Sequence, residues 1–148
     1  MVKGQRIYRY HSFAIIIRIM NHTILLVEDN EQNRYLATFL LEQRGYRVTP
    51  APDGLTGIEL AKSSVPELIL LDIQLPILDG YQVAQALRSI DTLRNTPIVA
   101  VTSYAMPGDR EKCLDAGCNG YIEKPINPDT FVAEIERFLP SPIGEERR

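Results

Sequence analysis

The sequence predicts a doubly wound α/β domain, in which five parallel strands form one sheet with helices on both faces. The central observation is the run Leu68–Leu71, which is apolar without interruption and then stops at Asp72. Such a run is typical of a parallel strand that helices cover on both sides. The second observation is that short apolar runs alternate five times with segments of helical spacing. A chain of 148 residues is long enough for one domain with a core of this kind.

The first half of the domain begins with a strand at Ile24–Val27. We expect a helix after it that ends before Gly45 and has four apolar residues on its buried face: Tyr35, Leu36, Phe39 and Leu40. A short strand at Tyr46–Thr49 is expected towards an edge of the sheet. The second helix begins near Asp53, and its inward residues are predicted to be Leu55, Ile58 and Ala61.

The second half repeats this alternation after the central strand. A third helix is expected from about Gly80, with an apolar face of Val83, Ala84, Leu87 and Ile90. After a fourth strand at Ile98–Val101, Pro107 and Gly117 suit the first position and the end of a fourth helix. Its apolar face has only Cys113 and Leu114, so we expect shallow packing and mobility. A fifth strand at Gly120–Glu123 precedes a helix from about Pro128 whose inward residues are Phe131, Ile135, Phe138 and Leu139.

The pattern divides the chain into an N-terminal extension at 1–22, one domain at 23–139 and a short tail at 140–148. The extension has four basic residues and no acidic residue, whereas the remainder holds the other 12 basic residues and all 19 acidic residues, a net charge of −7. We interpret the extension as a non-native start with Met20 as the natural one, or as a loosely ordered segment. A basic segment for a membrane surface or a partner is the less favoured alternative.

Composition also excludes several classes of function. An acidic domain has no electrostatic footprint for nucleic acid. The apolar run Phe13–Ile17 is too short to span a bilayer, and no small-residue cleavage site follows it. We therefore expect a cytoplasmic protein whose two cysteines, Cys113 and Cys118, are free thiols that serve packing. A metal or redox role for them is less favoured, since neither His11 nor His22 is close in sequence.

Polar residues stand where the predicted strands end. Glu28 and Asp29 follow the first strand, Asp72 ends the central strand, and Thr102 and Lys124 follow the fourth and fifth strands. The carboxyl ends of parallel strands share one edge of the sheet, which is where open α/β sheets bind their ligands. Taken singly, each residue could equally be a helix cap, a loop contact or a surface group. Their combined order along the chain favours one shared site.

The chemistry of this set points to phosphoryl transfer. Three carboxylates in one crevice repel one another, and a divalent cation with oxygen ligands, Mg²⁺ in particular, removes that problem. A lysine and a hydroxyl can then donate to the charge that develops on a phosphoryl group during transfer. Asp72 lies in the middle of the set and is the natural nucleophile, which would form an acyl phosphate.

With these residues in place, residues 23–139 resemble the receiver domain of bacterial two-component response regulators. The resemblance rests on Glu28-Asp29, on the segment LILLDIQLPILDG with Asp72, on VTSYA with Thr102 and on YIEKP with Lys124. It covers essentially the whole domain and is especially close to the stand-alone receivers of cell-cycle and relay pathways. It implies a flavodoxin-like strand order 2-1-3-4-5, for which a receiver is itself a standard example.

The resemblance also implies roles for individual residues. Asp72 would accept a phosphoryl group from a phosphohistidine on a histidine kinase or a histidine phosphotransfer protein. Asp72 and Asp29 would bind Mg²⁺ directly, together with the backbone carbonyl of Gln74, and Glu28 would act through a bound water. Lys124 would pair with Asp72 and then with the phosphoryl group.

A switch is implied as well. Thr102 would move to hydrogen-bond the phosphoryl group and Tyr121 would turn inward behind it. The change would alter the face formed by the fourth helix, the fifth strand and the fifth helix, where a downstream protein would bind. The Lys124–Pro125 bond is expected to be cis, and the side chains of Gln74 and Tyr104 would border the path of an attacking water and tune the lifetime of the phosphoryl group.

Other functions were weighed against the receiver. An aspartyl-phosphate hydrolase needs a second acid two residues after the nucleophile, where Gln74 stands. A flavin carrier needs a phosphate-binding loop after the first strand, and Glu28-Asp29 would repel that phosphate. The remaining alternative is a pseudo-receiver, an interaction module that works without phosphorylation. The sequence leaves open the kinase, the target and the oligomeric state.

Overall fold

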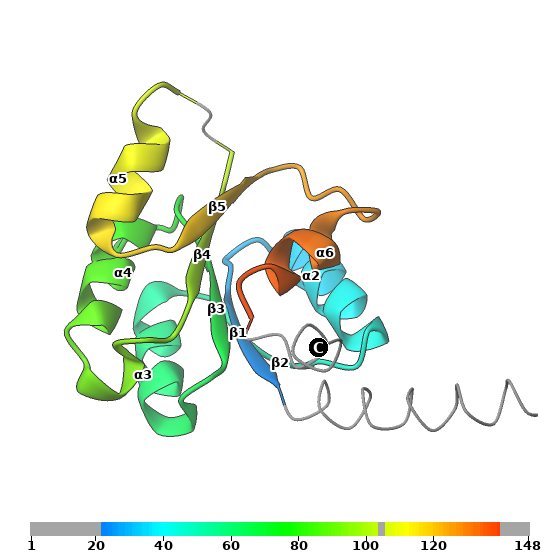
Figure 1. Ribbon diagram of the computed structural model, residues 1–148, viewed down its shortest axis with the longest axis horizontal. Helices are drawn as coiled ribbons and strands as arrows, with labels where there is room; N and C mark the ends of the chain where they lie inside the picture. The colour runs from blue at the N-terminus through cyan, green and yellow to red at the C-terminus, as the bar shows by residue number, and fades with distance from the viewer. Residues whose placement is uncertain (1–21, 104–105, 140–148) are drawn as a thin grey trace, which may run out of the picture.

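The fold is an alternating α/β arrangement, seen in a computed structural model that describes residues 22–103 and 106–139 (Figure 1). The predicted extension and tail, as well as Tyr104, lie outside the described residues apart from His22. The elements in chain order are β1 (Thr23–Val27), α2 (Glu31–Gln43), β2 (Arg47–Ala51), α3 (Gly54–Ser64), β3 (Leu68–Asp72), α4 (Gly80–Arg88), the 3₁₀ turn η1 (Asp91–Leu93), β4 (Ile98–Thr102), α5 (Asp109–Ala116), β5 (Gly120–Glu123) and α6 (Phe131–Glu136).

The five strands form one parallel sheet in the order β2-β1-β3-β4-β5. This confirms the predicted fold class and strand order. All residues of β3 and β4 are buried, as their uninterrupted apolar runs predicted. Strand β2 lies at an edge, also as predicted, and it contains Pro50. Proline has no N–H to donate to a neighbouring strand, so sheets tolerate it at an edge, where one side needs no partner.

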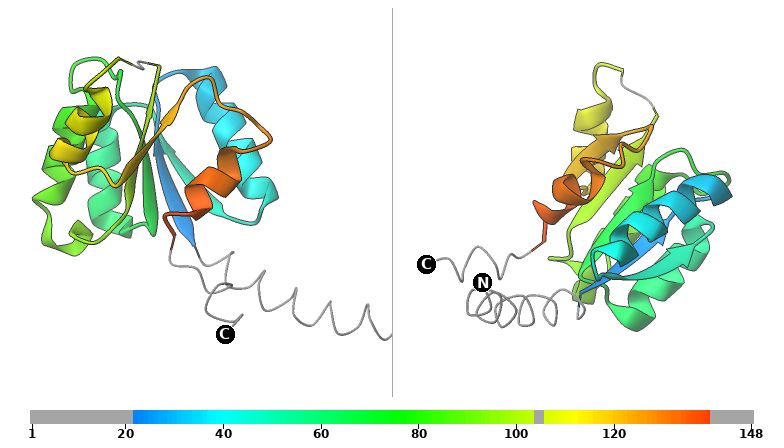
Figure 2. Two further views of the ribbon diagram at one scale, coloured as in Figure 1. Left: turned by 45° about the horizontal axis from the view of Figure 1, so that its top comes forward. Right: turned by 90° about the vertical axis from the view of Figure 1, so that its right-hand side faces the viewer.

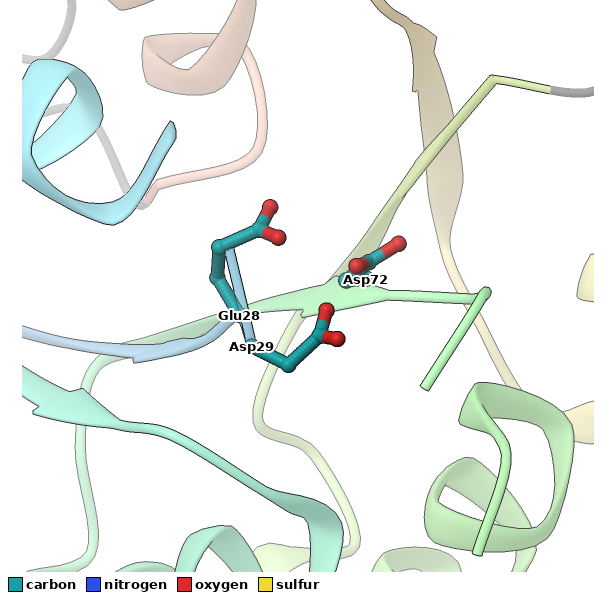
Figure 3. A group of neighbouring side chains, drawn as sticks. All are labelled: Glu28, Asp29 and Asp72. Carbon is teal, nitrogen blue, oxygen red and sulfur yellow. The ribbon is translucent and has the colours of Figure 1, made fainter. Parts of the chain in front are cut away.

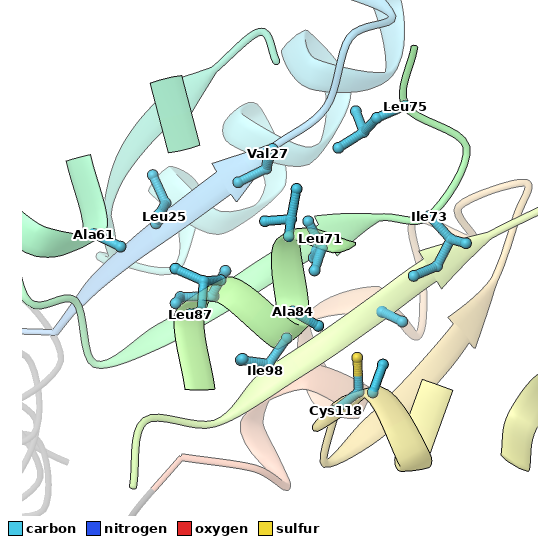
Figure 4. Close-up of a cluster of buried hydrophobic side chains, with 14 of the residues drawn as sticks. Leu25, Val27, Ala61, Leu71, Ile73, Leu75, Ala84, Leu87, Ile98 and Cys118 are labelled. Carbon is cyan, nitrogen blue, oxygen red and sulfur yellow. The ribbon is translucent and has the colours of Figure 1, made fainter. Parts of the chain in front are cut away.

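Helices cover both faces of the sheet. Helices α3, α4 and α5 lie on one face, whereas α2 and α6 lie on the other (Figures 1 and 2). Each face has its own buried cluster. The larger one joins the sheet to α3, α4 and α5 through residues such as Ala61, Leu71, Leu87 and Cys113, of which the first three are labelled in Figure 4. The smaller one joins the sheet to α2 and α6 through Leu41 and Phe131 among others.

The predicted buried faces of two helices are wrong in part. In α2, Tyr35 is 73% exposed and Phe39 is 46% exposed, and their rings stack on one another at the surface. The residues that α2 buries are Ala37 and Leu41. In α3, Leu55 is 64% exposed, although Ile58 and Ala61 do contact the core as predicted.

The cause of the error in α3 is close packing. A Cβ atom added to Gly57 would lie 2.7 Å from the side chain of Val27 on β1. The helix therefore turns Gly57 to the sheet, and the residues that it buries are all small: Gly54, Gly57 and Ala61. A search for large apolar residues at helical spacing cannot find such a face.

The last two helices also differ from prediction at their starts. Helix α5 begins at Asp109 because Gly108 is its N-cap, so Pro107 lies just outside it. Its end at Gly117, which has φ +113°, is as predicted. Helix α6 begins at Phe131 rather than near Pro128, after a turn in which the N–H of Thr130 donates to the carbonyl of Asn127.

Both cysteines are free and buried, as predicted for packing residues. Burial raises the pKa of the Cys113 thiol and raises that of the Cys118 thiol to about 12. A protonated, buried thiol is a poor nucleophile. Among the described residues, no helix is long and apolar enough to cross a membrane.

Helix α4 begins directly against the segment that follows Asp72. The N–H of Gly80 donates to the carbonyl of Ile73 at 3.0 Å. A Cβ atom at Gly80 would lie 2.5 Å from Ile73 Cα and 2.6 Å from the carbonyl oxygen of Asp72, both of which belong to the backbone and cannot rotate away. Glycine at this position therefore sets the distance between α4 and the end of β3.

We predict that Gly80→Ala lowers the free energy of unfolding by about 1–3 kcal/mol through overpacking, despite the better helix propensity of alanine. Urea unfolding followed by circular dichroism measures the change. Gln85→Ala, at an exposed position of the same helix, is the control and should have little effect. Equal stability of wild type and Gly80→Ala would contradict the close contact.

Candidate functional site

The site lies where β1 and β3 end side by side. The two strands pair in a register that sets Val27 opposite Leu71, so Glu28 and Asp29 follow β1 next to Asp72, the last residue of β3. The three carboxylates point towards one another (Figure 3) and offer oxygen atoms that all lie within 4.8 Å of one another. Glu28 and Asp72 are buried, whereas Asp29 is exposed. The structure thus brings together the three acids that the sequence predicted to meet.

The turn after β1 fixes the position of Glu28. The N–H of Glu28 donates to the carbonyl of Ala51 on β2, and its carboxylate accepts the N–H of Asn30 at 3.1 Å. Asn30 is also the N-cap of α2, since its side chain accepts the N–H of Asn33. Arg34 donates to the carbonyl of Glu28 at 2.8 Å. Arg34 was not predicted from the sequence, because an arginine on the first turns of a helix gives no signal of a contact back to the preceding loop.

Lys124 joins the two buried carboxylates. Its ammonium nitrogen lies 3.1 Å from Glu28 Oε1 and 3.3 Å from Asp72 Oδ2, and its side chain is only 12% exposed. The backbone N–H of Lys124 donates to the carbonyl of Thr102 at 2.8 Å, which extends the pairing of β4 with β5 past their ends. The Lys124–Pro125 peptide bond is cis, as predicted.

The charges in the site do not balance. The pKa of Asp72 is raised above its usual value, chiefly by burial and then by the negative charge of Glu28, and the nearby Lys124 offsets this only in part. Three carboxylates and one ammonium leave two negative charges, which a divalent cation would neutralise. Carboxylate and carbonyl oxygens in a compact cluster are the ligands that Mg²⁺ prefers, so the donor set fits this ion.

Thr102 and Gln74 form the side of the site towards β4. Thr102 ends β4, is 2% exposed, and accepts a hydrogen bond from Gln74 Nε2 at 2.5 Å. The backbone N–H of Gln74 donates to Asp72 Oδ1 at 3.0 Å. Tyr121 lies on β5, paired in register with Ala100, and is partly buried against the larger core cluster. The Gln74–Thr102 bond was not foreseen from the sequence.

Comparisons with known proteins agree with this fold and site. The profile of the response regulator receiver domain matches residues 24–136. Over 120 residues the chain is 42% identical to the polar-differentiation response regulator DivK of Brucella anthropi, covering 81% of this chain and 98% of that protein.

Solved structures of receiver proteins also have the same fold as this chain. The chemotaxis protein CheY4 of Vibrio cholerae superposes with a TM-score of 0.77 at 27% identity, over 80% of this chain and 98% of that one. The receiver domain of the sensor histidine kinase PA1611 of Pseudomonas aeruginosa, with a magnesium ion in its active-site cleft, reaches 0.73 at 39% identity, over 79% of this chain and 96% of that one.

A five-stranded parallel sheet with an acidic cluster at the β1/β3 switch point defines the class of flavodoxin-like signalling domains. Within that class, the chain belongs to the response regulator receiver family. It is a response regulator of the DivK and CheY type, part of two-component signalling, and the predicted resemblance to stand-alone receivers is confirmed. Members of this family are regulators that bind Mg²⁺ at an acidic site, and this chain has a cluster of three acidic side chains.

The raised pKa of Asp72 gives a prediction for stability. Since the folded state holds this proton more tightly than the unfolded state, whose pKa is near 3.8, stability should fall as pH rises from that value through the folded pKa. Asp72→Asn removes the charge, so without metal it should raise the free energy of unfolding at pH 7 and should make that free energy depend less on pH.

The measurement is urea unfolding with a chelator present, between pH 4 and pH 7 (roughly the range of carboxylate titration). Asp115→Asn, at an exposed position of α5, is the control and should leave the pH dependence unchanged. A variant Asp72→Asn that is less stable than wild type throughout would show that the buried charge is fully compensated.

Proposed function

We propose that this response regulator accepts a phosphoryl group on Asp72 from a phosphohistidine, in a reaction that needs Mg²⁺. The observation that carries the proposal is the group of three carboxylates within 4.8 Å, with one ammonium on two of them. In the transfer, the bond from phosphorus to the imidazole nitrogen breaks and a bond from phosphorus to a carboxylate oxygen of Asp72 forms. The imidazole leaves with the electron pair of the broken bond.

The metal would be held by Asp29 and Asp72 with the backbone carbonyl of Gln74, while Glu28 would act through a bound water. When bound, Mg²⁺ supplies charge neutralisation for the phosphoryl oxygens. Lys124 would then exchange its contact with Asp72 for one with a phosphoryl oxygen, while Glu28 keeps it in place at 3.1 Å. The acyl phosphate would return slowly to the carboxylate when water attacks phosphorus, so the protein would act as a switch or a relay intermediate and not as a turnover enzyme.

The partners follow from the same proposal. The donor would be a histidine kinase or a histidine phosphotransfer protein. The target would be a protein that recognises the face of α5, β5 and α6, because Thr102 and Tyr121 lie on β4 and β5 beside that face. We propose the cytoplasm as its compartment, in keeping with two cysteines that are both free thiols.

Phosphorylation can be tested directly on the purified chain. We predict that acetyl phosphate with Mg²⁺ adds one phosphoryl group, seen as a single adduct in the intact mass. The adduct should be absent with a chelator and absent in Asp72→Asn, which keeps the size of the side chain but not its nucleophilic oxygen pair.

The control is Asp115→Asn, which removes one exposed carboxylate and should be labelled like wild type. If wild type takes no adduct from acetyl phosphate or from a phosphohistidine donor, the proposal fails and an interaction module that works without phosphorylation becomes the better description. An adduct that persists in Asp72→Asn would place the acceptor elsewhere.

A further inference from the structure

Gln74 contacts both the proposed phosphoryl acceptor and the residue at the end of β4. Its backbone N–H donates to Asp72 Oδ1 at 3.0 Å. Its side chain reaches across to β4, where Nε2 donates to Thr102 Oγ1 at 2.5 Å and Oε1 accepts the N–H of Ser103 at 3.1 Å. One residue thus links the end of β3 to the end of β4 through three hydrogen bonds.

The orientation of the Gln74 amide follows from its partners. The backbone N–H of Ser103 can only donate, so the atom facing it must be the amide oxygen. The amide nitrogen then faces Thr102 and donates to its hydroxyl oxygen. Because Thr102 is almost completely buried and Gln74 is partly buried, this bond is shielded from competing water.

The hydrogen bonds of the Gln74 side chain lie beyond the ends of β3 and β4. Gln74 lies two residues beyond Asp72, and Ser103 lies one residue beyond Thr102, so both stand past the strand ends. The amide therefore binds the Thr102 hydroxyl from a residue that lies beyond the end of β3. Ser103 is also where the chain leaves β4 on its way to α5, so the same amide holds the first residue of that connection.

We propose that Gln74 is a positioning residue that holds Thr102 and Ser103 in the unphosphorylated arrangement. The inference rests on the proposed function, since a phosphoryl group on Asp72 is what competes for the Thr102 hydroxyl. When Thr102 turns to that group, it leaves the Gln74 amide, and Ser103 loses its acceptor. The side chain of Gln74 thereby couples the acceptor loop to the start of the β4–α5 connection, and it opposes the switch until phosphorylation offsets its two bonds.

A contact present in only one of two states shifts their equilibrium by its own free energy. Removing the amide should therefore favour the phosphoryl-like state. The probe is beryllofluoride with Mg²⁺, a stable mimic of the phosphoryl group, titrated against the full chain. We predict that Gln74→Met, which keeps the length of the side chain, tightens beryllofluoride binding about three- to tenfold.

The effect must depend on Thr102. Thr102→Val keeps the shape of the side chain and removes the hydroxyl, so adding Gln74→Met to it should leave beryllofluoride affinity nearly unchanged. Gln85→Met on the exposed side of α4 is the matched control and should behave like wild type.

A second measurement follows the Ser103 amide itself. In wild type its hydrogen exchange should speed up when beryllofluoride binds, and in Gln74→Met it should already be fast without the mimic. Unchanged or weaker beryllofluoride binding by Gln74→Met, an equal gain in the Thr102→Val background, or an equally protected Ser103 amide in both states of wild type would each overturn the inference. If wild type binds no beryllofluoride at all, the proposed function fails first, which separates the two failures.

Discussion

The pairing of β1 with β3 is the constraint on which the site depends. Its register leaves Glu28, Asp29 and Asp72 at one strand edge with no freedom to separate. Two of these carboxylates are buried, and burial raises the pKa of Asp72 in the folded state. Lys124 supplies one positive charge to a group of three acids. A divalent cation would therefore stabilise the site, and under the proposed function it would favour the ionised form of Asp72, which acts as the nucleophile.

Under the proposed function, the elements around Asp72 would transmit a change at this residue to the surface. Gly80 begins α4 against the backbone of Asp72 and Ile73, so this close contact fixes the backbone at the end of β3. On the other side, the contacts are side-chain hydrogen bonds, which can exchange partners. Gln74 holds Thr102 there, and Thr102 in turn is paired with β5 beside α5. The backbone contact at Gly80 would hold the end of β3 in place, whereas the hydrogen bond between Gln74 and Thr102 can exchange partners. We therefore expect a structural change to begin on the side of the site towards β4.

How far the sequence predicts the structure depends on the kind of contact. Buried strands were predictable because Leu68–Leu71 is apolar on both faces, and the site acids were predictable because each follows such a run. The inner faces of α2 and α3 were predictable only in part: Ala61 was predicted to face inward, but Ala37 and Gly57 are small and give little hydrophobic signal. The Gln74–Thr102 bond joins residues 28 positions apart and depends on a side-chain direction after the strand ends, which no periodicity encodes.

The most direct test of this account is a crystal structure with Mg²⁺ and beryllofluoride. The account predicts beryllium on a carboxylate oxygen of Asp72, with the metal on Asp29, Asp72 and the Gln74 carbonyl. Lys124 and Thr102 would contact the fluorides, and the Gln74 amide would no longer bond Thr102. A structure with beryllofluoride on Asp72 in which the metal avoids Asp29, or one in which the mimic binds at another carboxylate, would contradict the central claim that the three acids form a metal-assisted phosphoryl acceptor.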